Sequence, residues 1–237
     1  MRKKLAIAGM MLMLTAAGFT SKVSAQSGTT VKVTADLVSS YVWRGVTSTN
    51  TPNFQPTFAL VNGGFELGVW GSSDFSGVYK EADIYATYTV GSLKLGVTDY
   101  NWNFKTRYFD FKKETTAHVF EGSISWLGTE SLPLSVSLNT MLYGADKKAT
   151  DVTKNAYSTY IEFGYAFSQF SVFAGVTPAD GYYGDGYGGV EGLSVCNLGL
   201  TASKNLKITD SYSLPIKATF GVNPQKEDAY LVFGITF

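Results

Sequence analysis

The chain has 237 residues, with 19 basic and 19 acidic side chains and therefore no formal net charge. This balance argues against a nucleic-acid partner, which would require a basic patch and a high pI. With one cysteine, Cys196, and one histidine, His118, the chain can form no internal disulfide and cannot supply the ligands of a structural zinc site. We expect no cofactor and no metal, and we interpret Cys196 as an inert apolar side chain.

The first residues resemble an export signal. A basic start is followed by an apolar run from Leu5 to about Phe19 and by small residues that suit a cleavage site. The run is shorter than the roughly 20 apolar residues of a membrane helix. We predict a signal peptide over Met1–Ala25, which carries four of the basic residues and no acid, so the mature domain 26–237 would have 15 basic and 19 acidic side chains, a net charge of −4.

The remaining composition favours β-strands. The chain contains 16 Phe, 15 Tyr and 4 Trp but only 6 Pro, and no stretch after residue 25 is apolar for long enough to be a membrane helix. Apolar residues alternate with polar or small ones in segments near the length of a tilted membrane strand. We predict twelve strands, at about 30–45, 53–62, 64–75, 79–91, 92–102, 116–127, 131–145, 155–168, 169–178, 193–203, 212–222 and 228–237.

The connections between these segments alternate in length. Every second one is short, at 62–64, 91–92, 127–130, 168–169 and, longest of this set, 204–211. The others are mostly longer, at 46–52, 103–115, 146–154 and 179–192. Short periplasmic turns opposite long external loops are typical of bacterial outer-membrane barrels, as is an even strand number. The fold class is therefore predicted as all-β, a transmembrane antiparallel β-barrel of about twelve strands with both termini periplasmic.

Charged strand residues mostly share the polar face, as a water-filled lumen allows and a lipid-facing wall does not. The lumen-lining candidates are Lys32, Asp36, Arg44, Glu66, Glu81, Asp83, Lys94, Glu121, Glu162 and Lys217. Their net charge of −2 predicts a modest preference for cations, with Glu81 and Asp83 as its main origin unless Lys94 or Arg44 pairs with them. Aromatic residues near strand ends are expected to form interfacial girdles: Tyr41, Trp43, Trp102, Trp126, Phe167, Phe170 and Phe237.

Two stretches carry a family resemblance. The segment Asp36-Leu37-Val38-Ser39-Ser40-Tyr41-Val42-Trp43-Arg44-Gly45 resembles the opening strand of the TorF-type porins, small outer-membrane barrels of mostly unknown function. The final Tyr230–Phe237 is similar to the terminal strand that such barrels present to their assembly machinery, with Phe237 as the signal. The resemblance implies an outer-membrane location among lipid and lipopolysaccharide, and a porin-like role, but no particular solute.

Three local features could carry further function. The Gly-rich segment 181–189 lacks the Lys-Ser/Thr of a phosphate loop; it could be a flexible external loop, a sugar-stacking patch, or a calcium loop using Asp180, Asp185 and Glu191. Segment 103–115 has a surplus of two positive charges and could contact lipopolysaccharide, fold into the pore, or form a solvated tip. We interpret His118 as a rim histidine at the water boundary and expect no enzyme, because no Ser lies two residues from it.

Twelve strands lie between about eight, where side chains fill the interior, and about sixteen, where a wide channel opens. We therefore predict a narrow, partly plugged lumen that is crossed by salt bridges and passes small solutes slowly. The alternative is a non-conducting surface or structural barrel whose external loops bind a ligand or partner.

Overall fold

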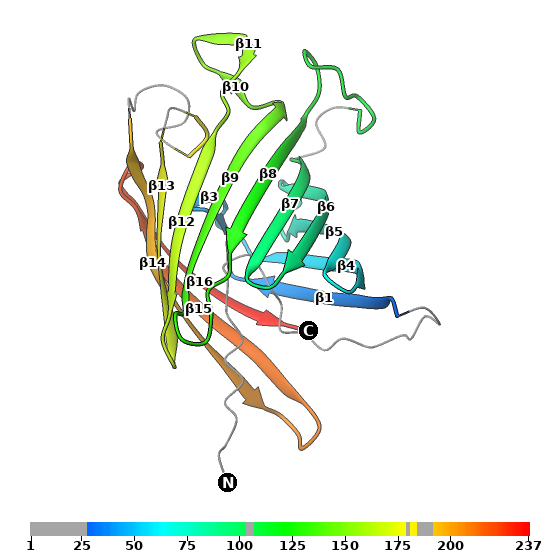
Figure 1. The fold of residues 1–237 in the computed structure, drawn as a ribbon, viewed down its shortest axis with the longest axis vertical. Coiled ribbons are helices and arrows are strands. Elements are labelled where there is room, and N and C mark those ends of the chain that lie inside the picture. The colour runs from blue at the N-terminus through cyan, green and yellow to red at the C-terminus, as the bar shows by residue number, and fades with distance from the viewer. Residues whose placement is uncertain (1–27, 103–106, 179–180, 184–191) are drawn as a thin grey trace.

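The computed structural model describes residues 28–102, 107–178, 181–183 and 192–237. Within these residues there are strands and no helices, and twelve antiparallel strands close into a barrel, which confirms the predicted all-β antiparallel barrel of about twelve strands (Figure 1). The wall strands, in chain order, are β1 (Thr30–Val38), β4 (Asn53–Asn62), β5 (Phe65–Asp74), β6 (Lys80–Val90), β7 (Leu93–Asn101), β8 (His118–Trp126), β9 (Leu134–Gly144), β12 (Thr159–Ala166), β13 (Phe170–Thr177), β14 (Ser194–Lys207), β15 (Ser213–Asn223) and β16 (Asp228–Thr236).

The wall is apolar outside and polar inside. On β4, Phe54 and Phe58 are 45% and 46% exposed, whereas Gln55 between them is 2% exposed. Since successive residues of a strand point to opposite faces, the exposed phenylalanines lie on the outer face and Gln55 faces the interior. The other wall strands show the same alternation. It is the opposite of the arrangement in a water-soluble domain, where apolar residues face the interior and polar residues face the solvent.

The two ends of the barrel differ. One end carries the short connections between β4 and β5, β6 and β7, β8 and β9, β12 and β13, and β14 and β15, and we call it the turn end. The C-terminus lies toward the same end (Figure 1). The opposite end, here the loop end, carries the longer connections, including a small hairpin of β10 (Lys147–Lys148) and β11 (Asp151–Asn155).

The prediction of a single strand over residues 30–45 is wrong for its C-terminal part. The wall strand β1 stops at Val38, and the chain then forms a separate hairpin of β2 (Tyr41–Trp43) and β3 (Val46–Thr49), part of which was predicted as a loop. Its turn residues, Arg44 and Gly45, both have positive φ angles, of 53° and 79°. This is the backbone of a type I′ turn, whose twist matches that of the flanking strands in a two-residue hairpin.

One strand pair is longer than predicted. The prediction ended the tenth strand at residue 203, but β14 continues to Lys207 and stays paired with β15 as far as Ser213. Its other neighbour, β13, reaches only Ala202. The two strands therefore project as a ribbon beyond the wall at the turn end (Figure 1).

The barrel closes where β1 meets β16. Three residue pairs form this seam, from Asp36 with Thr236 to Val38 with Gly234. Beyond them, the backbones of Ala35 and Phe237 exchange two hydrogen bonds, of 3.2 and 2.9 Å. Asp36 reinforces the seam, since its carboxylate accepts hydrogen bonds from Thr236 and from Lys217 on β15. The final phenylalanine is thus part of the closure, with its side chain 48% exposed.

Candidate functional site

The β2–β3 hairpin lies inside the barrel at the loop end. Tyr41 packs against Trp70 of β5 at a ring-centroid distance of 5.6 Å, and Trp43 packs against Tyr100 of β7 at 5.2 Å. At its turn, the Gly45 carbonyl accepts a hydrogen bond of 2.9 Å from Asn223 of β15. A hairpin that contacts strands on different sides of the wall must occupy the lumen, and we call residues 41–49 the plug hairpin.

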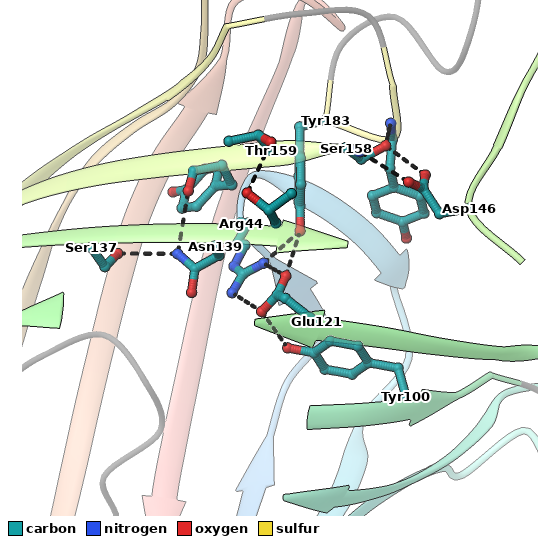
Figure 2. Close-up of polar contacts among 12 residues, drawn as sticks. Arg44, Tyr100, Glu121, Ser137, Asn139, Asp146, Ser158, Thr159 and Tyr183 are labelled. Carbon is teal, nitrogen blue, oxygen red and sulfur yellow. Dashed lines mark hydrogen bonds and ion pairs between the residues drawn. The ribbon is translucent and has the colours of Figure 1, made fainter. Parts of the chain in front are cut away.

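Arg44, at the tip of the plug hairpin, forms a bidentate ion pair with Glu121 of β8. The Nη1–Oε2 distance is 2.6 Å and the Nη2–Oε1 distance is 2.9 Å. The Tyr100 hydroxyl donates a further bond of 3.0 Å to Glu121, whose side chain is only 2% exposed. Figure 2 shows the guanidinium held between Glu121 and the hydroxyl of Tyr183. Such paired geometry is the form in which a charged pair tolerates burial.

Aromatic rings enclose the same guanidinium. Its carbon lies 4.6 Å from the ring centroid of Trp43, 5.2 Å from that of Tyr160 and 5.6 Å from that of Tyr183. A cation over an aromatic face is attracted by the ring quadrupole, more strongly where water is excluded. The αL backbone of Arg44 is costly for a residue with a Cβ, and these contacts offset that cost.

Tyr183 is held in the lumen by a short polar chain. The Ser158 hydroxyl donates to Asp146 at 2.6 Å, and the Ser158 oxygen accepts from the Tyr182 backbone N–H at 2.9 Å (Figure 2). Asp146 lies in the loop after β9, and its burial raises the pKa of its carboxyl. This chain fixes the backbone beside Tyr183, whose side chain is fully buried.

The lumen at the loop end is filled by side chains. One buried cluster contains Tyr100, Val119, Met141, Tyr160, Tyr183 and Cys196, with Trp43, Trp102 and Tyr182 packed against it. The girdle prediction is therefore wrong for Tyr41, Trp43 and Trp102, which point inward because the plug hairpin gives them partners. Trp126, Phe167, Phe170 and Phe237 do lie on the outer face toward the turn end.

The other lumen-lining candidates occupy inner-face positions of the wall. They are Lys32, Asp36, Glu66, Glu81, Asp83, Lys94, Glu121, Glu162 and Lys217. Two pairs bridge next-nearest strands: Lys217 to Asp36 at 3.0 Å, and Lys32 to Glu66 at 3.6 Å. Arg44 differs from the rest, since it reaches the lumen from the plug hairpin and not from the wall.

Glu81, Asp83 and Glu162 are held by neutral donors. Glu81 accepts from the Trp102 indole at 2.8 Å and the Tyr79 hydroxyl at 2.6 Å, and Glu162 accepts from the Tyr160 hydroxyl. Asp83 accepts from a backbone N–H of β7. Within the described part of the chain, no Lys or Arg lies at salt-bridge distance from these three acids. They therefore brace the wall at the loop end through hydrogen bonds.

Toward the turn end, the inner face changes character. Ser125, Ser137, Asn139, Ser171 and Thr201 point inward from β8, β9, β13 and β14. Among the described groups, the Asn139 side-chain oxygen and the Ser171 hydroxyl are buried without a hydrogen-bond partner. Buried polar atoms of this kind are usually satisfied by water or another polar molecule. This half of the lumen is suited to polar contents.

The remaining predicted sites have different outcomes. His118 is fully buried and pairs with Asp99 of β7, so its interpretation as a residue at the water boundary is wrong. The described part of segment 103–115 does not enter the pore. Asp180, Asp185 and Glu191 lie outside the described residues, so the calcium loop stays untested. Elsewhere in the described ranges, no cluster of His, Cys, Asp and Glu could hold a metal.

Sequence reasoning missed the partners of Arg44. Tyr100 and Tyr160 follow the ordinary alternation of wall strands, and Tyr183 lies in a Gly-rich segment without periodicity. One signal was available for the hairpin itself: Gly45 directly follows Arg44, between two short runs of strand-forming residues, as in a two-residue turn.

Comparison with known proteins identifies a family for this chain, but that family has no described activity. Residues 22–212 match the model of a family described as a bacterial protein of unknown function (Gcw_chp). No curated protein matches the chain. In the described ranges, no helix is long and apolar enough to cross a membrane.

Proposed function

Because the chain belongs to this bacterial family of unknown function, we propose its role from its own geometry. It is a narrow porin-like channel of the outer membrane, held closed at the loop end by the plug hairpin. The observation that carries the proposal is the Arg44–Glu121 contact, which fixes a separate hairpin inside the barrel. The other half of the lumen is lined by small polar side chains and by the charged residues Lys32, Glu66 and Lys94.

A membrane location is supported by the outer face of the wall. Large apolar side chains there are about half exposed to solvent, among them Val69, Val97, Phe163 and Phe233. Contiguous exposed apolar surface of this extent marks contact with lipid or a partner. The resemblance of the opening strand to TorF-type porins agrees with this location, and lipid and lipopolysaccharide would be the neighbours. The predicted leader Met1–Ala25 lies outside the described residues and stays a prediction.

The polar half of the lumen supports a conduit. A barrel with a purely structural role could fill this region with apolar side chains, as it does at the loop end. Instead, serine, threonine and asparagine side chains face the interior, and two of their polar atoms lack a partner among the described groups. Solutes small enough to pass would be polar, and opening would require the plug hairpin to move. We propose no catalytic role.

Single-channel recording in planar bilayers tests the proposal. The wild type should be closed for most of the time and open briefly. Arg44→Gln with Glu121→Gln removes the ion pair without leaving a buried charge, and a charged hydrogen bond is worth about 1.5–3 kcal/mol. The open fraction should therefore rise about tenfold or more, while the conductance of each open step stays the same.

The matched control is Lys32→Gln with Glu66→Gln, an ion pair on the wall that does not touch the plug hairpin. It should leave the open fraction unchanged. If both double variants and the wild type stay silent, the channel is refuted. That result would favour the second candidate, a non-conducting surface barrel, which the filled aromatic lumen at the loop end also allows.

Orientation is tested by labelling intact cells with an impermeant thiol reagent. Lys148→Cys at the loop end should react, because the proposed orientation places that end outside the cell. Gln169→Cys at the turn end should not react, although both sites are exposed. A Cys196→Ser background removes the buried native thiol. The reverse labelling pattern would invert the orientation, and equal labelling would argue against insertion in the outer membrane.

A further inference from the structure

A strap covers the outside of the barrel at the loop end. We use this name for residues 107–117, which directly precede β8. Phe111 of the strap lies against the His118 ring at a centroid distance of 4.4 Å, and its carbonyl accepts a bond of 2.8 Å from the Tyr143 hydroxyl of β9. The strap is thus fastened to two neighbouring wall strands, β8 and β9.

The residues beneath the strap point away from the lumen. Asp99 is paired across the sheet with Ile84 and with Phe120, and directly opposed residues share a face. Ile84 is 43% exposed on the outer face, so Asp99 lies on that face too. Asn101 and His118 form the next pair on the same face. An acid, an amide and a histidine therefore interrupt a wall that is otherwise apolar outside.

Both nitrogens of the His118 ring face acceptors. Nδ1 lies 2.8 and 2.9 Å from the two carboxylate oxygens of Asp99, and Nε2 lies against the backbone carbonyl oxygen of Tyr108 in the strap. A carbonyl can only accept, and a neutral imidazole has a single N–H. A hydrogen bond at Nδ1 to Asp99 and another at Nε2 to the Tyr108 carbonyl each require one proton. The two protons can both lie on the His118 ring, or one of them can lie on the Asp99 carboxyl. The neutral ring beside an ionised Asp99 would leave one contact repulsive.

Asn101 supports the same protonation. Its amide nitrogen lies 3.1 Å from Nε2, and its amide oxygen has no partner among the described groups. A half-turn of this amide would bring the oxygen to Nε2, as an additional acceptor for the N–H.

Titratable groups from β7, β9 and the strap surround the His118 ring. Asp99 faces it from β7, the Tyr108 ring faces it from the strap, and Tyr143 of β9 lies behind Phe111. Across the wall, Asp83 accepts from the Asn101 backbone N–H. In the described ranges, no Lys or Arg lies at salt-bridge distance from Asp99. His118 is therefore the group on the wall that contacts both Asp99 and the strap.

We propose that His118 is a proton-operated latch for the strap. With both ring nitrogens protonated, the strap is bound to the outer wall through Tyr108. Loss of one proton breaks either the Asp99 contact or the Tyr108 contact, and the strap detaches. The strap is closed at low pH, where the ring holds both protons, and it opens when the pH is raised far enough for the ring to lose one of them. The latch stands apart from the channel proposed above.

Because His118 is the single histidine of the chain, nitrogen NMR of an untagged, ¹⁵N-histidine-labelled protein reads it directly. At pH 5 both ring nitrogens should carry a proton, and one should lose it as the pH is raised to 9. A ring with one protonated nitrogen at pH 5, or with two at pH 9, would overturn the proposal.

Strap movement is measured separately, by the spin–spin distance between labels at Lys112→Cys on the strap and Glu130→Cys at the turn end, in the Cys196→Ser background. The distance distribution should be narrow at pH 5 and broad at pH 9. His118→Gln, which cannot titrate, should give one distribution at both values. A wild-type distribution that is unchanged between pH 5 and pH 9 would refute the latch even if His118 titrates.

Discussion

Glu121→Ala should lower the free energy of unfolding of the barrel by about 3–5 kcal/mol, because it leaves the Arg44 guanidinium buried and unpaired. The carboxylate accepts from Arg44 twice and from Tyr100 once, and it is 2% exposed. Urea titration of protein folded in lipid vesicles, followed by tryptophan fluorescence, measures the change. The midpoint should fall without a change in slope, since the same surface is exposed on unfolding.

The double variant Arg44→Met with Glu121→Met is the matched control. It removes both charges and keeps apolar volume in place, so it should cost less than Glu121→Ala alone, as replaced buried ion pairs commonly do. Single variants at the two positions complete a double-mutant cycle. A double variant that is as unstable as the sum of the two singles would show that Arg44 and Glu121 are not coupled.

Gly144→Ala should be nearly as severe, for a backbone reason. Gly144 ends β9 with a φ of 107°, and an added Cβ would stand 1.8 Å from the His118 carbonyl oxygen. That carbonyl accepts a hydrogen bond of 2.8 Å from the Ala145 N–H. The clash must open this contact, so we expect a loss of about 3 kcal/mol or more from strain and the broken bond together. The same urea titration measures it.

Gly77→Ala separates the two causes of this loss. Gly77 lies in the turn between β5 and β6 with a φ of 75°, but an added Cβ would meet nothing within 4 Å. Gly77→Ala should therefore lower the free energy of unfolding only by the cost of placing an alanine at a positive φ angle, about 1–2 kcal/mol. Equal losses at both positions would mean that the β8–β9 contact accommodates the methyl group and that the predicted clash is wrong.

The wall strands could be predicted from the sequence because the alternation of apolar and polar residues is a property of each short segment by itself. Each wall strand alternates between apolar residues on the outer face and polar residues on the inner face, and this leaves a period of two in segments such as 157–167. Turn lengths then indicate the two ends. Every predicted segment overlaps one wall strand, and the errors in the wall fall at strand ends, such as the extension of β14 to Lys207.

The plug hairpin could not be predicted in this way. A hairpin folded into the lumen has the same period of two as the wall, so residues 41–45 look like a continuation of β1. Only the contacts of Arg44 with β8 and of Gly45 with β15 place it inside. These partners are far apart in the chain, and nothing in the local pattern joins them.

The Asp99–His118 pair was missed for a related reason. The prediction assigned strand charges to the lumen, whereas Asp99 faces outward and is tolerated there because the strap covers it. An acid on an otherwise apolar outer face is itself informative, because its burial requires a segment that covers it. The sequence indicates the exception only after the register is known.

The short seam between β1 and β16 has a consequence for how the barrel is made. Its contacts join residues 200 positions apart, as in the hydrogen bond from Thr236 to Asp36, whereas β1 and β4 zip together along nine nearby pairs. Contacts between residues so distant in the chain form late, because the entropy of the large intervening loop must be lost first. While the chain folds, the sheet can grow strand by strand, but it stays an open, curved ribbon with two unpaired edges. Only arrival of the last residues converts it into a cylinder, so the time at which the C-terminus becomes available sets the time of closure.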